Sequence, residues 1–114
     1  MSWRIKFYET ASGQEPVRKF ILSLQSSTKA KFLRQFDLLE ELGPELGMPN
    51  AKPIGDGLFE LRVRGKEEVR SLYIFQEGDV IFILHAFKKK AMSIQKKDLK
   101  IALERKKEIR NLPD

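Results

Sequence analysis

The 114-residue sequence contains no cysteine and only one histidine, His85. Without cysteine the chain forms no disulfide and holds no reactive thiolate, and one histidine is too few for the usual structural zinc sites. No segment approaches the ~20 apolar residues that a transmembrane helix needs, and residues 1–13 lack the apolar core of a signal peptide. We therefore expect a cytoplasmic protein with no metal, no other cofactor and no membrane partner.

Acidic side chains are too few to balance the basic ones in the second half of the chain. Residues 1–61 carry eight Lys and Arg against eight Asp and Glu, whereas residues 62–114 carry fourteen against eight, which accounts for the whole net charge of +6. A positive field on one side of a protein attracts nucleic acid, an acidic partner or an anionic membrane surface. The alternative is that these side chains only keep one face of the protein solvated.

Hydrophobic periodicity predicts one α+β domain over residues 1–114. The content of 41% hydrophobic and 33% charged residues is typical of a globular chain, and the length suits a single core. Alternation of apolar and polar residues indicates strands, and apolar residues spaced three and four apart indicate helices. The predicted order is a strand at 3–9, helices at 16–24 and 26–42, an ordered loop at 44–57, strands at 58–64, 69–75 and 79–87, and a basic helix at 93–111.

Local signals set the expected helix ends and packing. Pro16 suits the first position of a helix, residues 26–28 (Ser-Ser-Thr) offer caps for the second helix, and Ser93 offers an N-cap for the last. The two consecutive helices should form a hairpin that packs on a small, mainly antiparallel sheet. The strand at 79–87 is apolar on both faces, which favours a central place in that sheet.

A group of lysines follows this apolar strand, in the stretch VIFILHAFKKKAMSIQKKDLK. Lys88, Lys89 and Lys90 come at the end of the strand, and Lys96 and Lys97 fall in the first turn of the last helix. The helix dipole disfavours a cation there by roughly 0.3–1 kcal/mol, so stability alone does not explain these residues. A helix N-terminus beside lysines favours the binding of phosphate. One interpretation is an anionic ligand, and the other is a solvated surface.

Four segments in the same order resemble the RelE/HigB superfamily of toxin–antitoxin ribonucleases, and in particular its phage-derived Gp49-like branch. They are DGLFELRVR, VRSLYIF, LHAFKKK and the basic helix that contains ALER, and the loop ELGPELGMP also fits the branch. The resemblance implies a RelE-like fold of order β-α-α-β-β-β-α. It also implies a toxin that cuts messenger RNA on the translating ribosome and that is held inactive by an antitoxin, usually a helix-turn-helix protein in this branch.

Metal-free RNA cleavage of this kind uses the 2′-hydroxyl of the substrate as the nucleophile. The protein must supply a base, cations for the transition state and a proton for the leaving 5′-oxygen. Arg62 and Arg70 match positions where the family keeps basic residues on the sheet, and a guanidinium group binds phosphate oxygens in a bidentate manner. We expect both to be phosphate ligands. The alternative for Arg62 is an ion pair with Glu60 or Glu68, worth little at a surface.

The segment that ends the central strand supplies the other expected catalytic groups. Lys88 and Lys89 are candidates for the acid or base, because neighbouring ammonium groups lower one another's pKa. His85 titrates in the right range, although a lone histidine in an apolar strand is commonly a core residue. Phe87 is expected to stack on a splayed base. The residues expected to bind RNA or the ribosome are Arg64, Phe87, Lys90, Lys96 and Lys97.

One departure from the resemblance leaves the general base open. Several RelE-type toxins place a catalytic tyrosine or histidine in the C-terminal segment, and this chain has neither after Phe87. Two other readings therefore stay open. One is a non-cleaving toxin on the same fold, as in the ParE-like inhibitors of DNA gyrase. The other is an inactive module that binds an antitoxin or nucleic acid.

Overall fold

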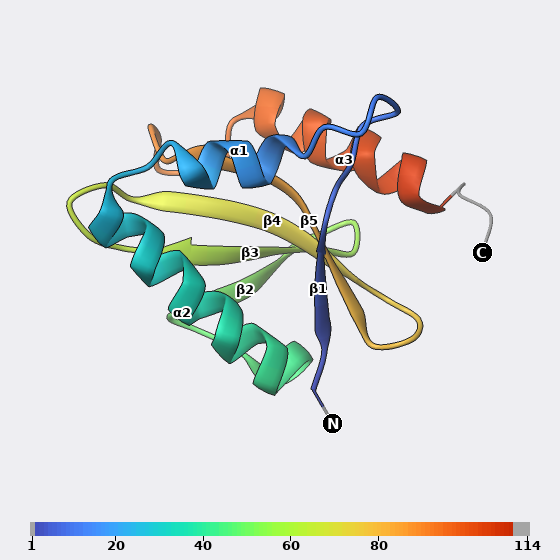
Figure 1. Ribbon diagram of the computed structural model, residues 1–114, viewed down its shortest axis with the longest axis horizontal. Helices are drawn as coiled ribbons and strands as arrows, with labels where there is room; N and C mark the ends of the chain where they lie inside the picture. The colour runs from blue at the N-terminus through green and yellow to red at the C-terminus, as the bar shows by residue number, and fades with distance from the viewer. Residues whose placement is uncertain (1, 111–114) are drawn as a thin grey trace.

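The computed structural model describes residues 2–110 and has five strands and three α-helices (Figure 1). The elements are β1 (Arg4–Phe7), α1 (Pro16–Leu22), α2 (Ser26–Leu42), the 3-10 turn η1 (Gly43–Glu45), β2 (Ala51–Gly55), β3 (Leu58–Val63), β4 (Val69–Gln76), β5 (Val80–Lys88) and α3 (Lys96–Arg110). Among the described residues, no helix has both the length and the apolar content to cross a bilayer.

The five strands form one sheet in the order β1-β5-β4-β3-β2. β1 pairs with β5 in parallel, and the other three pairs are antiparallel. The α+β class, the mainly antiparallel sheet and the interior place of β5 are therefore confirmed. β4 and β5 form an antiparallel hairpin across residues 77–79.

The predicted element order was wrong in one place, because β2 lies inside the stretch expected to be a loop. Its five residues include Pro53 and Gly55, which argue against an interior strand. β2 is an edge strand that pairs only with β3, so the missing N–H of a proline is tolerated there. The register shifts between Pro53 and Gly55, as is common in edge strands.

Two of the expected helix caps are also wrong. α1 begins at Pro16 as predicted. α2 already begins at Ser26, with Gln25 before it and no side-chain hydrogen bond at the cap. α3 begins at Lys96, three residues after Ser93, so the segment before it is free to line a cleft. The predicted end of this helix at Asn111 lies outside the described residues.

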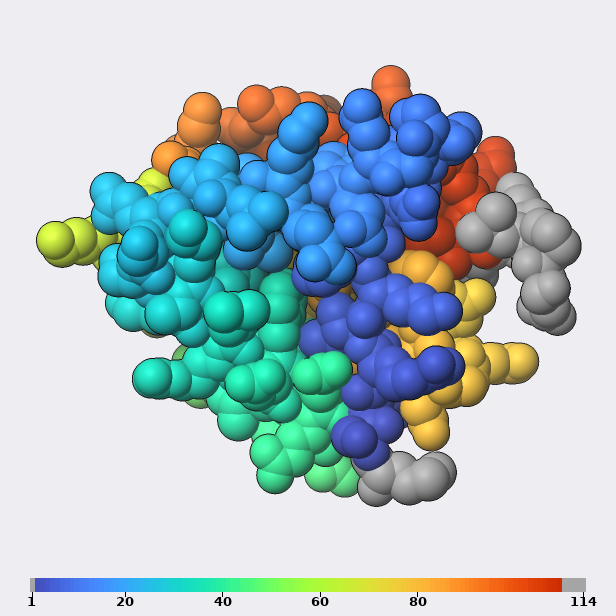
Figure 2. Space-filling model, viewed as in Figure 1, coloured from blue at the N-terminus to red at the C-terminus, as the bar shows by residue number. Residues whose placement is uncertain are grey.

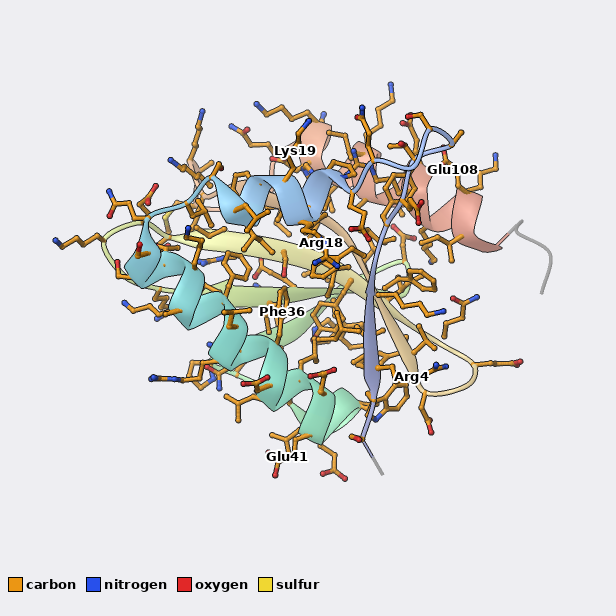
Figure 3. All side chains as sticks on the ribbon, in the orientation of Figure 1. Arg4, Arg18, Lys19, Phe36, Glu41 and Glu108 are labelled. Carbon is orange, nitrogen blue, oxygen red and sulfur yellow. The ribbon has the colours of Figure 1, made fainter. Side chains whose placement is uncertain are left out.

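The helices cover the two faces of the sheet separately. The side chains of α1 and α2 join one apolar cluster with the near face of the sheet, and α3 joins a second cluster on the opposite face. Figure 1 shows α1 and α2 in front of the strands, and Figure 2 shows that the blue to green residues, which include β1, α1 and α2, make up most of the near surface. Figure 3 shows Phe36 pointing from α2 toward the sheet, where it is buried.

A β-bulge in β5 decides which side chains face α3. Opposite Leu72 and Tyr73 of β4 stand His85 and Ile83, so Leu84 is an extra residue in β5. Because of this insertion, Leu84 and the two odd-numbered residues that follow, His85 and Phe87, all lie on the α3 side. The Leu84 carbonyl accepts a hydrogen bond of 2.8 Å from the Arg105 guanidinium of α3, which fixes the helix against the bulge.

Candidate functional site

A cleft of about 300 Å³ lies between the α3 side of the sheet and the segment that leads into α3. Strands β2 to β5 form its floor, and residues 89–95 and the first turn of α3 form its wall. Six of the residues predicted from the sequence line it: Arg62, Arg70, Phe87, Lys88, Lys89 and Lys90. The structure also adds residues that were not predicted to belong to the site: Lys52, Ile54, Glu60, Ile94, Asp98 and Leu99.

Strand register brings three of the predicted residues into one row. Arg62 of β3 stands opposite Arg70 of β4, and Arg70 stands opposite Phe87 of β5. Directly opposed residues on neighbouring strands hold their side chains on the same face, with Cβ atoms about 5 Å apart. The two guanidinium groups and the aromatic ring are therefore neighbours across the floor of the cleft.

Glu60 is the central acidic group of the cleft. It is only 4% exposed, and its carboxylate lies 3.0 Å from Nε of Arg62 and 3.7 Å from Nε of Arg70. Arg70 is itself 3% exposed. Glu60 was expected only as an ion-pair partner of Arg62, and that pairing is confirmed. The sequence could have suggested part of this arrangement, because Glu60 and Arg62 are two residues apart and therefore lie on the same face of β3.

The turn between β3 and β4 supplies carboxylates to the lysines of the cleft. Lys88 Nζ lies 2.7 Å from Glu67, and Lys89 Nζ lies 3.5 Å from Glu68. Glu68 also contacts Arg70 Nη2 at 3.3 Å. The Lys89 ammonium, helped by Arg70, lowers the pKa of Glu68. The crowding of like charges expected for the lysines is thus partly offset by these two carboxylates.

His85 lies beneath α3 and does not belong to the lining of the cleft. Its Nε2 is 2.8 Å from a carboxylate oxygen of Asp98 in the first turn of α3, and its side chain is 14% exposed. Its ring stacks on Phe87, with centroids 5.4 Å apart. This geometry fits a residue that holds the first turn of α3 and the Phe87 ring in place. The role of His85 as an acid or base stays a prediction.

The pH dependence of stability should report on His85. Burial lowers its pKa below the usual 6.5, and this effect exceeds the opposite effect of the hydrogen bond with Asp98, while Arg105 lowers the pKa further. The unfolded chain then binds the proton more readily than the folded chain. We expect the free energy of unfolding to be fully retained above about pH 6.5 and to decline as the pH falls below it.

Urea denaturation at several pH values between about 7.5 and 5.5 tests this dependence. His85→Gln removes the only histidine in the sequence and should flatten the curve near pH 6.5. A mutant curve as steep as that of the wild type would show that another group titrates there.

The remaining predicted residues lie outside the cleft. Arg64 is exposed just after β3, and its carbonyl accepts a hydrogen bond of 3.0 Å from Lys31. Lys96 and Lys97 are exposed in the first turn of α3, next to Gln95 and Asp98, which line the cleft. These two lysines extend the positive charge of the cleft along its rim.

Within residues 2–110, no three His, Cys, Asp or Glu side chains gather in a way that could hold a metal ion. Tyr73 is fully buried in the core, and burial raises the pKa of its hydroxyl. The expectation that the reaction needs neither a metal nor a cofactor stays a prediction.

Comparison with known protein families matches residues 19–107 to the family described as Phage derived protein Gp49-like (DUF891). The match extends from α1 to α3 and includes every strand that lines the cleft. A comparison with curated proteins finds no matching sequence. Because the match covers more than half of the 114 residues, this chain belongs to the Gp49-like family of phage-derived, toxin-like proteins.

Proposed function

We propose that this protein is the toxin of a toxin–antitoxin pair and cleaves messenger RNA on the translating ribosome. The toxin-like family supports the first part. The observation that carries the second part is the cleft, in which a buried carboxylate stands between two arginines beside three lysines. Such a site combines a proton acceptor with cations that stabilise a negatively charged transition state.

Arg62 and Arg70 are the proposed phosphate ligands. Guanidinium groups keep their charge and present parallel N–H donors that match phosphate oxygens. Opposed strand positions hold the two groups side by side, so both can contact the non-bridging oxygens of one phosphate. Their charge then stabilises the extra negative charge that develops when the fifth oxygen approaches phosphorus.

Glu60 is the proposed general base. Its carboxylate accepts the proton of the 2′-hydroxyl, and the 2′-oxygen then attacks the adjacent phosphorus. The bond from phosphorus to the 5′-oxygen breaks, which leaves a 2′,3′-cyclic phosphate on one fragment and a 5′-hydroxyl on the other. The two arginines keep Glu60 fixed beside the phosphate, so the hydroxyl and its base meet in one orientation. This role supplies the base that the C-terminal segment lacks.

A lysine of the cleft is the proposed proton donor to the leaving 5′-oxygen. Lys89 is the better placed of the two candidates, because its side chain is 31% exposed against 52% for Lys88. Its backbone N–H also donates to the Glu68 carbonyl at 2.9 Å, which anchors the residue at the end of β5. Lys88 and Lys90 then bind the flanking RNA backbone.

The toxin-like family implies an antitoxin. We propose that the antitoxin is a helix-turn-helix protein with an acidic segment that covers the cleft. Carboxylates of that segment would compete for the same cations that Glu67 and Glu68 already contact within this chain.

Primer extension on a translating messenger RNA tests the proposal. We expect cuts within the codon in the ribosomal A site, no cuts in naked RNA at the same protein concentration, and protection by the neighbouring antitoxin. Growth arrest without cuts would instead support a non-cleaving poison, for which DNA replication should stop before protein synthesis. Neither cuts nor arrest would leave an inactive binding module.

The rim lysines should contribute to affinity and little to the chemical step. Lys96→Ala and Lys97→Ala should each weaken ribosome binding and reduce the slope of log affinity against log salt by about one unit per lost phosphate contact. Lys19→Ala is the matched control, since Lys19 is an exposed lysine on α1 (Figure 3). Filter binding at several salt concentrations gives the slopes. An unchanged slope in both variants would assign the rim lysines to solvation alone.

A further inference from the structure

The cleft has apolar lining residues in addition to its cationic ones. They are Ile54 of β2, Phe87 of β5, Ile94 and Leu99 beside the start of α3, and Met92. We propose that these apolar residues form a binding subsite for a nucleobase, and that the base belongs to the nucleotide whose phosphate lies on Arg62 and Arg70. This inference rests on the proposed function and specifies how the substrate is held.

The spacing of Arg70 and Phe87 suits a single nucleotide. Phe87 stands directly opposite Arg70 on neighbouring strands, and such strands lie about 4.8 Å apart. A phosphate on the guanidinium group of Arg70 is therefore one strand away from the aromatic ring. The ribose of the same nucleotide can bridge that distance, so phosphate and base can be bound at once.

The Phe87 ring already stacks on the His85 ring on one side. His85 covers it at an interplanar angle of 26°, and the His85 ring is fixed by its contact with Asp98. A base that enters the cleft would extend this stack on the side of Phe87 that lines it. Base–aromatic stacking accepts every base, so this subsite provides affinity with little sequence preference.

Met92 is unusually exposed for a residue that lines a cleft. Its side chain is 96% exposed, the highest value among the exposed large hydrophobic side chains, although it lies in the lining of a cleft. A methionine side chain is flexible and polarisable and adapts to aromatic surfaces. We infer that Met92 closes over the outer face of the bound base, which would remove its apolar surface from water.

Methionine methyl NMR tests the subsite on the full chain. Protein labelled with ¹³C at the methionine methyl groups is titrated with adenosine 3′-monophosphate, with ribose 5-phosphate and with inorganic phosphate. The ring current of a base should shift the Met92 methyl signal in a saturable way with the nucleotide only. Met48, which is 62% exposed and lies outside the cleft, should not shift and serves as the internal control.

Phe87→Leu keeps an apolar side chain and removes the ring. It should weaken nucleotide binding by roughly tenfold, while the affinity for inorganic phosphate stays the same. Met48→Ala is the matched control for Met92→Ala, which should lower nucleotide affinity and leave the free energy of unfolding unchanged.

Two results would overturn the subsite: a Met92 shift as large with ribose 5-phosphate as with the nucleotide, or unchanged nucleotide affinity in Phe87→Leu. A failure of the proposed function, as opposed to a failure of the subsite, gives a different result. In that case the nucleotide still shifts Met92, but translating ribosomes show no cuts.

Discussion

Replacing Arg70 with lysine should reduce cleavage on the ribosome by about 100-fold or more while the protein stays folded. Arg70 is 3% exposed and contacts the carboxylates of both Glu60 and Glu68. Lysine keeps the positive charge that these carboxylates need. It cannot present two parallel N–H donors to a phosphate, so the transition state loses a fixed bidentate ligand.

Single-turnover primer extension with saturating ribosomes gives the cleavage rate, and urea denaturation confirms the fold. Arg18→Lys is the matched control, because Arg18 also pairs with a carboxylate, that of Glu15 at 2.6 Å. Arg18 lies on α1 (Figure 3) and its guanidinium group packs over the Phe7 ring. It is not among the residues that line the cleft. Cleavage within threefold of the wild-type rate in Arg70→Lys would remove this residue from the phosphate site.

Replacing Glu60 with glutamine should lower the cleavage rate by about 10²–10⁴, the usual contribution of a general base. The amide has nearly the same shape as the carboxylate but accepts no proton near neutral pH. The same change leaves the guanidinium groups of Arg62 and Arg70 without the carboxylate between them. Breaking a buried ion pair costs about 3 kcal/mol, so the free energy of unfolding should fall as well.

The two effects of Glu60→Gln can be separated. The rate is measured at low temperature and is corrected for the folded fraction found by circular dichroism. Inorganic phosphate should stabilise Glu60→Gln more than it stabilises the wild type, because the anion takes the place of the lost carboxylate between the arginines. Glu67→Gln is the control, since Glu67 pairs with Lys88, which is proposed to bind flanking RNA, and the change should leave the chemical step intact. A folded Glu60→Gln protein that cleaves at the wild-type rate would exclude Glu60 as the base.

Much of the fold follows from local patterns in the sequence. Alternation located β3, short strand-like apolar runs located β4 and β5, apolar spacing located α1 and α2, and Pro16 marked the start of α1. β2 was missed because its Pro53 and Gly55 are poor strand formers, and only its place at the edge of the sheet makes them acceptable. Edge position depends on the order of the strands, which no local pattern records.

The candidate site also combines features that local sequence predicts with features that depend on strand pairing. Local periodicity is enough to put Arg62 and Glu60 on one face of a strand and Lys88 to Lys90 at the end of another, because side-chain direction in a strand has a period of two residues. Only the assembled sheet brings Arg62, Arg70 and Phe87 into one row, because register between strands depends on pairing.

The bulge at Leu84 likewise depends on the packed fold. It turns His85 and Phe87 toward α3, whereas uninterrupted alternation along β5 would have sent both to the opposite face. The extra residue is stabilised by contacts with distant parts of the chain, namely the Arg105 hydrogen bond to the Leu84 carbonyl and the contact between His85 and Asp98. Those contacts exist only once α3 has packed on the sheet.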